Sequence, residues 1–403
     1  MLPFLLKTSY KLSSGDKKLT DNNNLTLPNS NEPSGTSGSP EHRSVKTEIV
    51  SVLSALLLSG ILFGTSAGIF IKIIITMFVS GVYAVLLISR TSFFVKLVPV
   101  LFPICSAIIH ALAISDMTSS DKSAFCAGLV LFVCFLLASA VITFCIIKRF
   151  TKTETLISLS AATLLSGAIG VVSAFIYNFG AFSISLLQQK ISEYCAKLHD
   201  VVMKYYTLIS QSEEFSQMLS KVSGGESMSQ DEFLSLADEY TELVITSLKA
   251  ITPAVLIILA MTAAAIALLG FTVCTGITRK KNLLGKGYFE YSVSSFSARV
   301  FNTVLFISML GTFIGLPGLV LTVCVNLLLI LIPPMSYIGI RCIFRIMLSR
   351  NMHPVGAAAV IFAILTVLVF ITGGFAVIAA ALSGVFFTFG AEARAKMFGN
   401  HEK

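Results

Sequence analysis

The sequence predicts an all-α polytopic transmembrane helical bundle of about ten spans, with an extracytoplasmic amphipathic helical hairpin. The first observation is composition: of 403 residues, 55% are hydrophobic and 12% are charged, whereas an ordinary soluble domain has about 25% charged residues. The second is that apolar residues gather in stretches of the length a bilayer requires, about 20 residues each. The third is one long polar segment, residues 186–249, which divides these stretches into two blocks.

The two ends of the chain are predicted to be cytoplasmic tails. Residues 1–46 contain SSGDKKLTDNNNLTLPNSNEPSGTSGSP, which is rich in Ser, Asn, Gly and Pro. Such a composition holds too few apolar residues to form a core, so we expect this tail to be disordered. Residues 397–403 form the short C-terminal tail.

Between the tails lie two predicted transmembrane blocks of five spans each, residues 47–185 and 250–396. The expected spans are 48–64, 67–89, 93–114, 124–147, 156–181, 251–274, 300–316, 318–340, 355–372 and 374–390. Only Thr372, Gly373 and Gly374 separate the last two, so residues 355–390 form either one span or two.

Loop charge predicts the orientation of these spans. Short cytoplasmic loops collect Lys and Arg, and the basic loops are those around Arg90, Lys148, Arg279 and Arg341. An even number of spans places all four loops, and both termini, on the cytoplasmic side. The segment 186–249 then lies outside, where its ten acids against five lysines fit the opposite face.

The outer segment is predicted to be a helical hairpin. One helical stripe of its first arm holds the apolar residues Ile191, Tyr194, Cys195, Leu198, Val201, Tyr205 and Leu208. We expect this arm to end near Ser223, Gly224 and Gly225. The second arm is expected to start at Ser229, because S-x-x-E to Glu232 is the sequence of a capping box.

Several classes of function are disfavoured by the sequence. Net charge is +8, but no dense basic run with interleaved aromatics predicts nucleic-acid binding. No G-x-x-x-x-G-K-[ST] phosphate loop and no H-E-x-x-H motif occurs. The eight cysteines include no C-x-x-C spacing. We therefore expect no enzyme, no cofactor and no metal site.

Ionisable residues inside spans are costly and are functional candidates by default. Lys72 lies near the outer start of the second span, and His110 and Asp116 bracket the outer end of the third. We expect these three residues to converge beneath the hairpin and to bind an anionic or zwitterionic solute. The alternative is that Lys72 extends alone to the headgroups and His110 is a neutral packing residue.

A row of small residues in the first span predicts close helix packing. Gly60, Gly64 and Gly68 recur every four residues, with Ser51, Ala55 and Ser59 on an adjacent face. Small residues let helices approach closely inside a protein or at a partner subunit. Internal packing is the favoured interpretation.

The layout resembles the YybS-like family of uncharacterised bacterial multi-pass membrane proteins. The resemblance is carried by ITPAVLIILAMTAAA, the basic loop ITRKKNLLGKGYFEYSV, the closing GGFAVIAAAL and FGAEARAK. It implies a bacterial cell membrane and supplies no functional residues. More remotely, the chain is similar to the substrate-binding subunits of energy-coupling-factor importers, which hold a small solute near the outer face and depend on a separate ATPase.

Two functions from different classes follow from the sequence. The first is a small-solute transporter or substrate-capture subunit that relies on other membrane subunits for energy. The alternative is a non-catalytic scaffold for envelope or sporulation assembly, with the hairpin as its docking surface. The expected partners are the lipid bilayer, other membrane subunits and a small solute.

Overall fold

The computed structural model describes residues 45–64, 68–89, 91–112, 119–212, 229–278, 284, 291–372 and 375–399. The predicted N-terminal tail lies almost wholly outside these residues, whereas residues 397–399 of the predicted C-terminal tail belong to the last helix. All regular elements within the described residues are helical, which confirms the predicted all-α class. They are α1 (Val45–Ser59), the π-helix η2 (Gly60–Gly64), α2 (Ile69–Ile88), α3 (Phe93–Leu112), α4 (Ser119–Ile147), α5 (Lys152–Phe179), α6 (Ile184–Ser210), α8 (Gln230–Ile277), α9 (Ser295–Ile314), α10 (Gly318–Ser349), α11 (Pro354–Thr372) and α12 (Phe375–Gly399).

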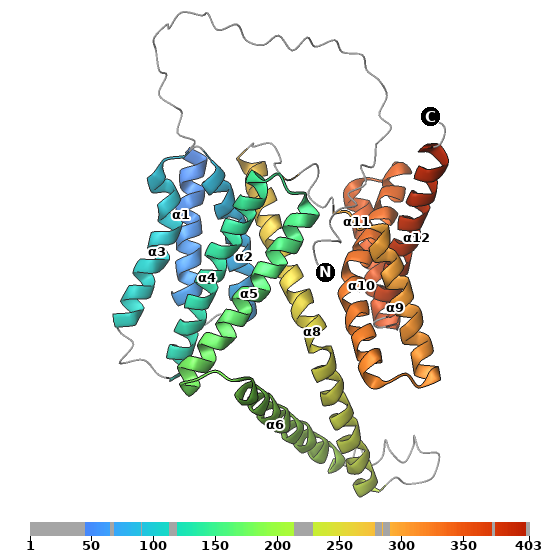
Figure 1. The fold of residues 1–403 in the computed structure, drawn as a ribbon. Helices are drawn as coiled ribbons and strands as arrows, with labels where there is room; N and C mark the ends of the chain where they lie inside the picture. The colour runs from blue at the N-terminus through green and yellow to red at the C-terminus, as the bar shows by residue number, and fades with distance from the viewer. Residues whose placement is uncertain are drawn as a thin grey trace, which may run out of the picture.

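The helices form two groups that α8 joins. Helices α1 to α5 form the first group, on one side of α8, and α9 to α12 form the second group (Figure 1). Helix α8 packs against α2 and α5 in the first group and against α10 in the second. One helix therefore links both halves of the predicted bundle.

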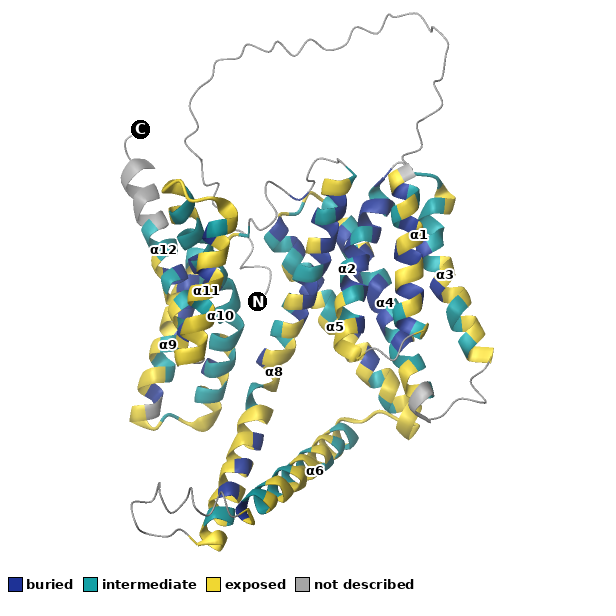
Figure 2. Cartoon of the chain, turned by 180° about the vertical axis from the view of Figure 1, so that it is seen from behind, coloured by how far each residue is buried: buried dark blue, intermediate teal, exposed yellow. Residues whose placement is uncertain are grey.

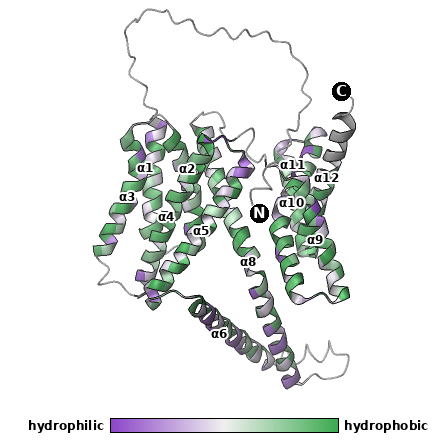
Figure 3. Cartoon of the chain, viewed as in Figure 1, coloured by the Kyte–Doolittle hydropathy of each residue, from purple (hydrophilic) through white to green (hydrophobic). Residues whose placement is uncertain are grey.

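Within the described ranges, eight helical segments are long and apolar enough to cross a bilayer, so the chain is a multi-pass membrane protein. Two shorter apolar helical segments, Ser295–Gly311 and Phe375–Gly390, correspond to the seventh and tenth predicted spans. The segment 355–390 is two helices, α11 and α12, which contact each other. Figure 3 shows the apolar character of these helices and the polar character of α6 and of the adjoining half of α8.

Helices α2 and α8 cross closely, and two glycines permit this approach. A Cβ added at Gly81 would lie 1.8 Å from the Ala267 carbonyl oxygen, and one at Gly270 would lie 2.1 Å from that of Phe78. Around this crossing the side chains of Met77, Ala264 and Phe271 are almost fully buried. Figure 2 shows the resulting concentration of buried residues on α2, α4 and the apolar half of α8.

In the second helix group, two helices also approach closely at glycines. Gly339 on α10 and Gly384 on α12 face each other, since a Cβ on Gly339 would lie 2.9 Å from the Gly384 nitrogen. Phe301, Met335 and Val385 pack into one apolar cluster beside that contact. Each group thus has its own core, built around close approach of two helix backbones.

The expectation for the glycine row of the first span is wrong. A Cβ at Gly60, Gly64 or Gly68 would meet no atom within 4 Å, because the π-helical turn at the end of α1 changes the helical register there. The adjacent row does pack inward: Ser51 and Ala55 are each 1% exposed, and Ser51 Oγ donates to the Val95 carbonyl of α3.

The hairpin differs from the prediction in one boundary. Its first arm, α6, ends at Ser210 rather than near residue 223. At this end, the Ser210 and Ser212 hydroxyls donate to the carbonyls of Thr207 and Ile209, which are among the last acceptors of the helix. The predicted breaker Ser223, Gly224 and Gly225 lies outside the described residues. The predicted capping box of Ser229 and Glu232 at the start of α8 is confirmed.

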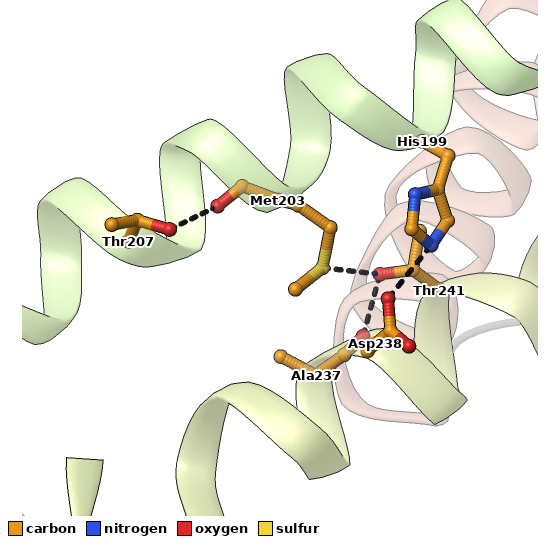
Figure 4. A network of polar contacts seen from close by, with 6 residues as sticks. All are labelled: His199, Met203, Thr207, Ala237, Asp238 and Thr241. Carbon is orange, nitrogen blue, oxygen red and sulfur yellow. Dashed lines mark hydrogen bonds and ion pairs between the residues drawn. The ribbon is translucent and has the colours of Figure 1, made fainter. Parts of the chain in front are cut away.

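The second arm and the sixth span are one continuous helix, α8, of 48 residues. Its polar half extends beyond the ends of the neighbouring spans, and α6 runs from the end of α5 towards its tip (Figure 1). The two arms meet through His199 with Asp238 and through Met203 with Thr241 (Figure 4). Nearer the tip, Gln230 donates to Ser210.

Candidate functional site

Lys72 is buried on α2, in the half of the first helix group that contains η2. The residue is 6% exposed, and its Nζ donates to the Leu62 carbonyl oxygen at 3.4 Å. Leu62 belongs to the last turn of the α1–η2 helix, whose final carbonyls have no partner further along the helix. A cation at this position also interacts favourably with the negative end of the helix dipole.

His110 lies in the last turn of α3, next to the same π-helical segment. Its Nδ1 is 2.9 Å from the Ser106 carbonyl oxygen, so this nitrogen carries the proton and donates it. The imidazole ring centre is 5.9 Å from that of Phe63, the residue after Leu62. Phe63 also contacts Phe125 of α4. Lys72 and His110 therefore contact consecutive residues of η2, and Nε2 of His110 has no hydrogen bond to a described residue.

The expected convergence of Lys72, His110 and Asp116 stays a prediction. The structure places Lys72 against the Leu62 carbonyl and His110 against the Phe63 ring, so each contacts η2. Asp116 lies outside the described residues, so its place in the site stays a prediction. No ion pair to Lys72 forms within the described ranges, and its described polar contact is the Leu62 carbonyl.

Two hydroxyl groups close to this region in sequence are buried without a hydrogen bond to any described residue. They are Ser59 Oγ, just before η2, and Thr76 Oγ1, one turn after Lys72 on α2. Thr76 is 0% exposed and Ser59 is 8% exposed. A buried hydroxyl without a partner costs free energy, so both groups retain capacity for a polar ligand or an ordered water.

Two features of this region have no signal in the sequence. The Leu62 carbonyl is a backbone group, and the π-helical turn that presents it has no sequence motif. Gly128 of α4 also approaches this carbonyl closely, because a Cβ there would lie 2.8 Å from the same Leu62 oxygen. Periodicity identifies faces of helices, but it does not identify a carbonyl at a helix end.

The chemistry available here is recognition of negative charge. A buried ammonium with three donors, a ring that gains charge when protonated, and two spare hydroxyls can bind a carboxylate or phosphate. Among the described residues no group of three or more His, Cys, Asp and Glu gathers to ligate a metal.

A second polar feature joins the two helix groups. Pro253 lies inside α8, and the Asn326 amide of α10 lies beside it: its Oδ1 accepts from the Ala254 N–H at 3.0 Å, and its Nδ2 donates to the Ala250 carbonyl at 2.7 Å. These are the two groups that an unbroken helix pairs with each other. Asn326 therefore satisfies the backbone of α8 at the junction of hairpin and span.

Comparison with known proteins adds no assignment: no protein-family model, no curated protein and no solved structure matches the chain. Fold and site define a multi-pass helical membrane protein with a buried cation beside a helix end.

Proposed function

We propose that this protein handles a small anionic or zwitterionic solute, as a transporter or as a substrate-capture subunit that depends on other subunits for energy. The observation that carries the proposal is Lys72: it is 6% exposed, and its Nζ contacts a carbonyl rather than a carboxylate among the described residues. Buried lysines are ordinarily paired with a negative group. In the proposed complex the solute supplies that negative group.

The neighbouring residues support the same class of ligand. His110 holds its ring through Nδ1, which leaves Nε2 available to the solute. Ser59 and Thr76 add two hydroxyls that lack partners among the described residues. Asp116 remains the proposed contact for an ammonium group of a zwitterionic solute.

The need for an energy-supplying partner rests on the sequence, which has no phosphate-binding loop of its own. Purification of the intact protein from native membranes tests this part. Recovery of an ATPase together with its membrane coupling subunit supports a capture subunit. Recovery of envelope-assembly proteins in stoichiometric amount supports the scaffold function instead.

The scaffold function is kept as a second candidate because of the hairpin. Large apolar side chains of α6, among them Tyr194, Val201 and Leu208, are more than 60% exposed. Lys72→Met separates the two candidates. A solute-handling protein loses its cellular function while its level in the membrane stays unchanged, whereas a scaffold retains its function. Lys249→Met, at an exposed lysine of α8, is the matched control and should be silent in both cases.

A further inference from the structure

The apolar stripe of α6 is exposed along its whole length. Its residues repeat at alternating spacings of three and four, as in the a and d positions of a coiled coil. They are Ile191, Tyr194, Leu198, Val201, Tyr205 and Leu208, and each is between 46% and 69% exposed. Such a narrow two-position stripe is typical of a helix–helix contact rather than of a broad apolar face.

The contact between α6 and α8 uses a different face of each helix. On α6 it involves His199, Met203, Tyr206 and Ser210, which contact Asp238, Thr241, Phe233 and Gln230 of α8. Residue numbers rise along α6 as they fall along α8, so the arms are antiparallel. Helix α8 also has an exposed stripe outside this contact, formed by Leu236, Tyr240 and Leu243, which are 52% to 62% exposed.

Charged residues border the two stripes with opposite signs. On α6, Lys190, Lys197 and Lys204 each immediately precede a stripe residue, and the three lysines are spaced by seven. On α8, Glu239 and Glu242 immediately precede Tyr240 and Leu243, and Glu232 lies seven residues before Glu239. The lysines and the glutamates thus lie on the same rotational side of their own stripe.

The position of the charged rows beside the stripes determines which helices of two hairpins can pair, and in which orientation. When two antiparallel helices face each other, residues on the same rotational side of each helix fall along the same edge of the contact. Placing the α6 stripe on an α8 stripe in antiparallel orientation therefore sets the lysine row beside the glutamate row. A parallel α6–α6 pair places the lysines beside the apolar residues Cys195 and Val202 and leaves the glutamates unused.

We propose that a second copy of this chain covers an exposed stripe, with the α6 stripe of one copy packed antiparallel on the α8 stripe of the other. The axial register follows that of the hairpin: the contacts of His199 with Asp238 and of Tyr206 with Phe233 place Lys197 at the level of Glu239, and Lys204 between Glu232 and Glu239. Because α6 is then antiparallel both to its own α8 and to the α8 of the second copy, the two α8 helices run parallel. This keeps the spans of both copies in the same orientation across one bilayer.

The charges that this arrangement pairs are available. Lys204, Glu239 and Glu242 are exposed and form no ion pair with other described residues. Lys190 is already held by Glu193 at 2.7 Å, so it is the least available of the row. The bilayer surface is a poorer occupant, because α6 inclines away from the spans towards the tip of α8 (Figure 1).

Charge reversal and rescue in the full chain test the proposal. Lys197→Glu with Lys204→Glu should turn a dimer of the 43.3 kDa chain into a monomer in detergent light scattering, with the dimer dissociation constant raised roughly tenfold or more. Adding Glu239→Lys and Glu242→Lys should restore the dimer. Lys249→Glu, outside both stripes, is the control and should leave the dimer intact. Circular dichroism verifies that every variant keeps its helix content.

The proposal is overturned if the wild-type chain is a monomer at every concentration. It is also overturned if the double reversal leaves the dimer unchanged, or if the four-residue exchange fails to restore the dimer while helix content is retained. A monomer whose α6 amides become protected from hydrogen exchange only in nanodiscs containing phosphatidylglycerol assigns the stripe to the bilayer and likewise overturns it.

Discussion

At the scale of single residues, the contact between α2 and α8 depends on the absence of a side chain at Gly81. The Gly81 position on α2 approaches the backbone of α8 so closely that an added Cβ would be 1.8 Å from the Ala267 oxygen and 2.6 Å from the Phe271 nitrogen. Both obstructing atoms are backbone, so no rotamer change relieves the clash. The helices would have to separate, and the buried side chains around Phe271 would lose contacts.

Gly81→Ala should therefore destabilise the protein, by about 1–3 kcal/mol as for other overpacked positions. The measurement is unfolding of the purified protein in detergent micelles. Gly167→Ala on α5 is the matched control, because a Cβ there meets nothing within 4 Å. Equal stability of the Gly81 and Gly167 variants would contradict the close crossing of α2 and α8.

The capping box of Glu232 makes the start of α8 sensitive to acid. The Ser229 N–H donates to the Glu232 carboxylate at 2.8 Å, and this backbone bond, together with the Ser229 side chain, lowers the pKa of Glu232. A lowered folded pKa means that the stabilisation is complete above the ordinary glutamate pKa of about 4.3. It declines as the pH falls below that value, and it is lost once the pH passes the lowered pKa.

We expect amide exchange in the first turn of α8 to accelerate on acidification through this range, after correction for the intrinsic rates. Ser229→Ala should cost that helix about 1 kcal/mol, but it keeps the backbone N–H that binds the carboxylate. Glu232→Gln, which cannot ionise, should remove most of the additional acid sensitivity. An unchanged pH profile in Glu232→Gln would show that another group is responsible.

At the scale of elements, the Asn326 amide supports a helix to which it does not belong. It bridges the Ala254 N–H and the Ala250 carbonyl beside Pro253, and it also donates to the Thr322 carbonyl of its own helix. Removing the amide leaves two backbone groups of α8 without these bonds in an apolar region. It also removes a link between the two helix groups.

Asn326→Ala should lower the free energy of unfolding by about 1–2 kcal/mol, the usual range for such bonds between membrane helices. Asn178→Ala is the control, since Asn178 is exposed and its amide donates to Ala174 of its own helix. Hydrogen exchange should in addition rise around residue 254 in the Asn326 variant alone. Similar effects of the two substitutions would contradict the bridging role.

How far the sequence predicts these elements depends on the kind of information each requires. Apolar length identified the spans, and the S-x-x-E pattern located the start of α8 at Ser229. Periodicity predicts the apolar stripe of α6, but it does not specify which partner covers that stripe. In the structure, α8 contacts a different face of α6. For the candidate site, Lys72 and His110 stood out as ionisable groups in spans, whereas the Leu62 carbonyl and the Asn326 bridge depend on three-dimensional packing.

At the scale of the whole molecule, loop charge predicts an even number of spans with both termini in the cytoplasm. The separation of α11 from α12 is compatible with ten crossings. Reporter fusions at the C-terminus and within residues 213–228 should report the cytoplasmic side and the outer side, respectively. A C-terminal reporter that is active only outside the cell would contradict this orientation.

The central claim is that Lys72 binds an anionic group of a solute, and thermal unfolding of the purified protein tests it most directly. The probes are inorganic phosphate, simple carboxylates and amino acids, each compared with chloride at equal ionic strength. A ligand at one hundred times its dissociation constant adds about 2.7 kcal/mol. We expect at least one probe to raise the Tm of the wild type and of Lys249→Met, and to have no effect on Lys72→Met. An equal rise in all three proteins, or no rise in the wild type with any probe, would contradict the account.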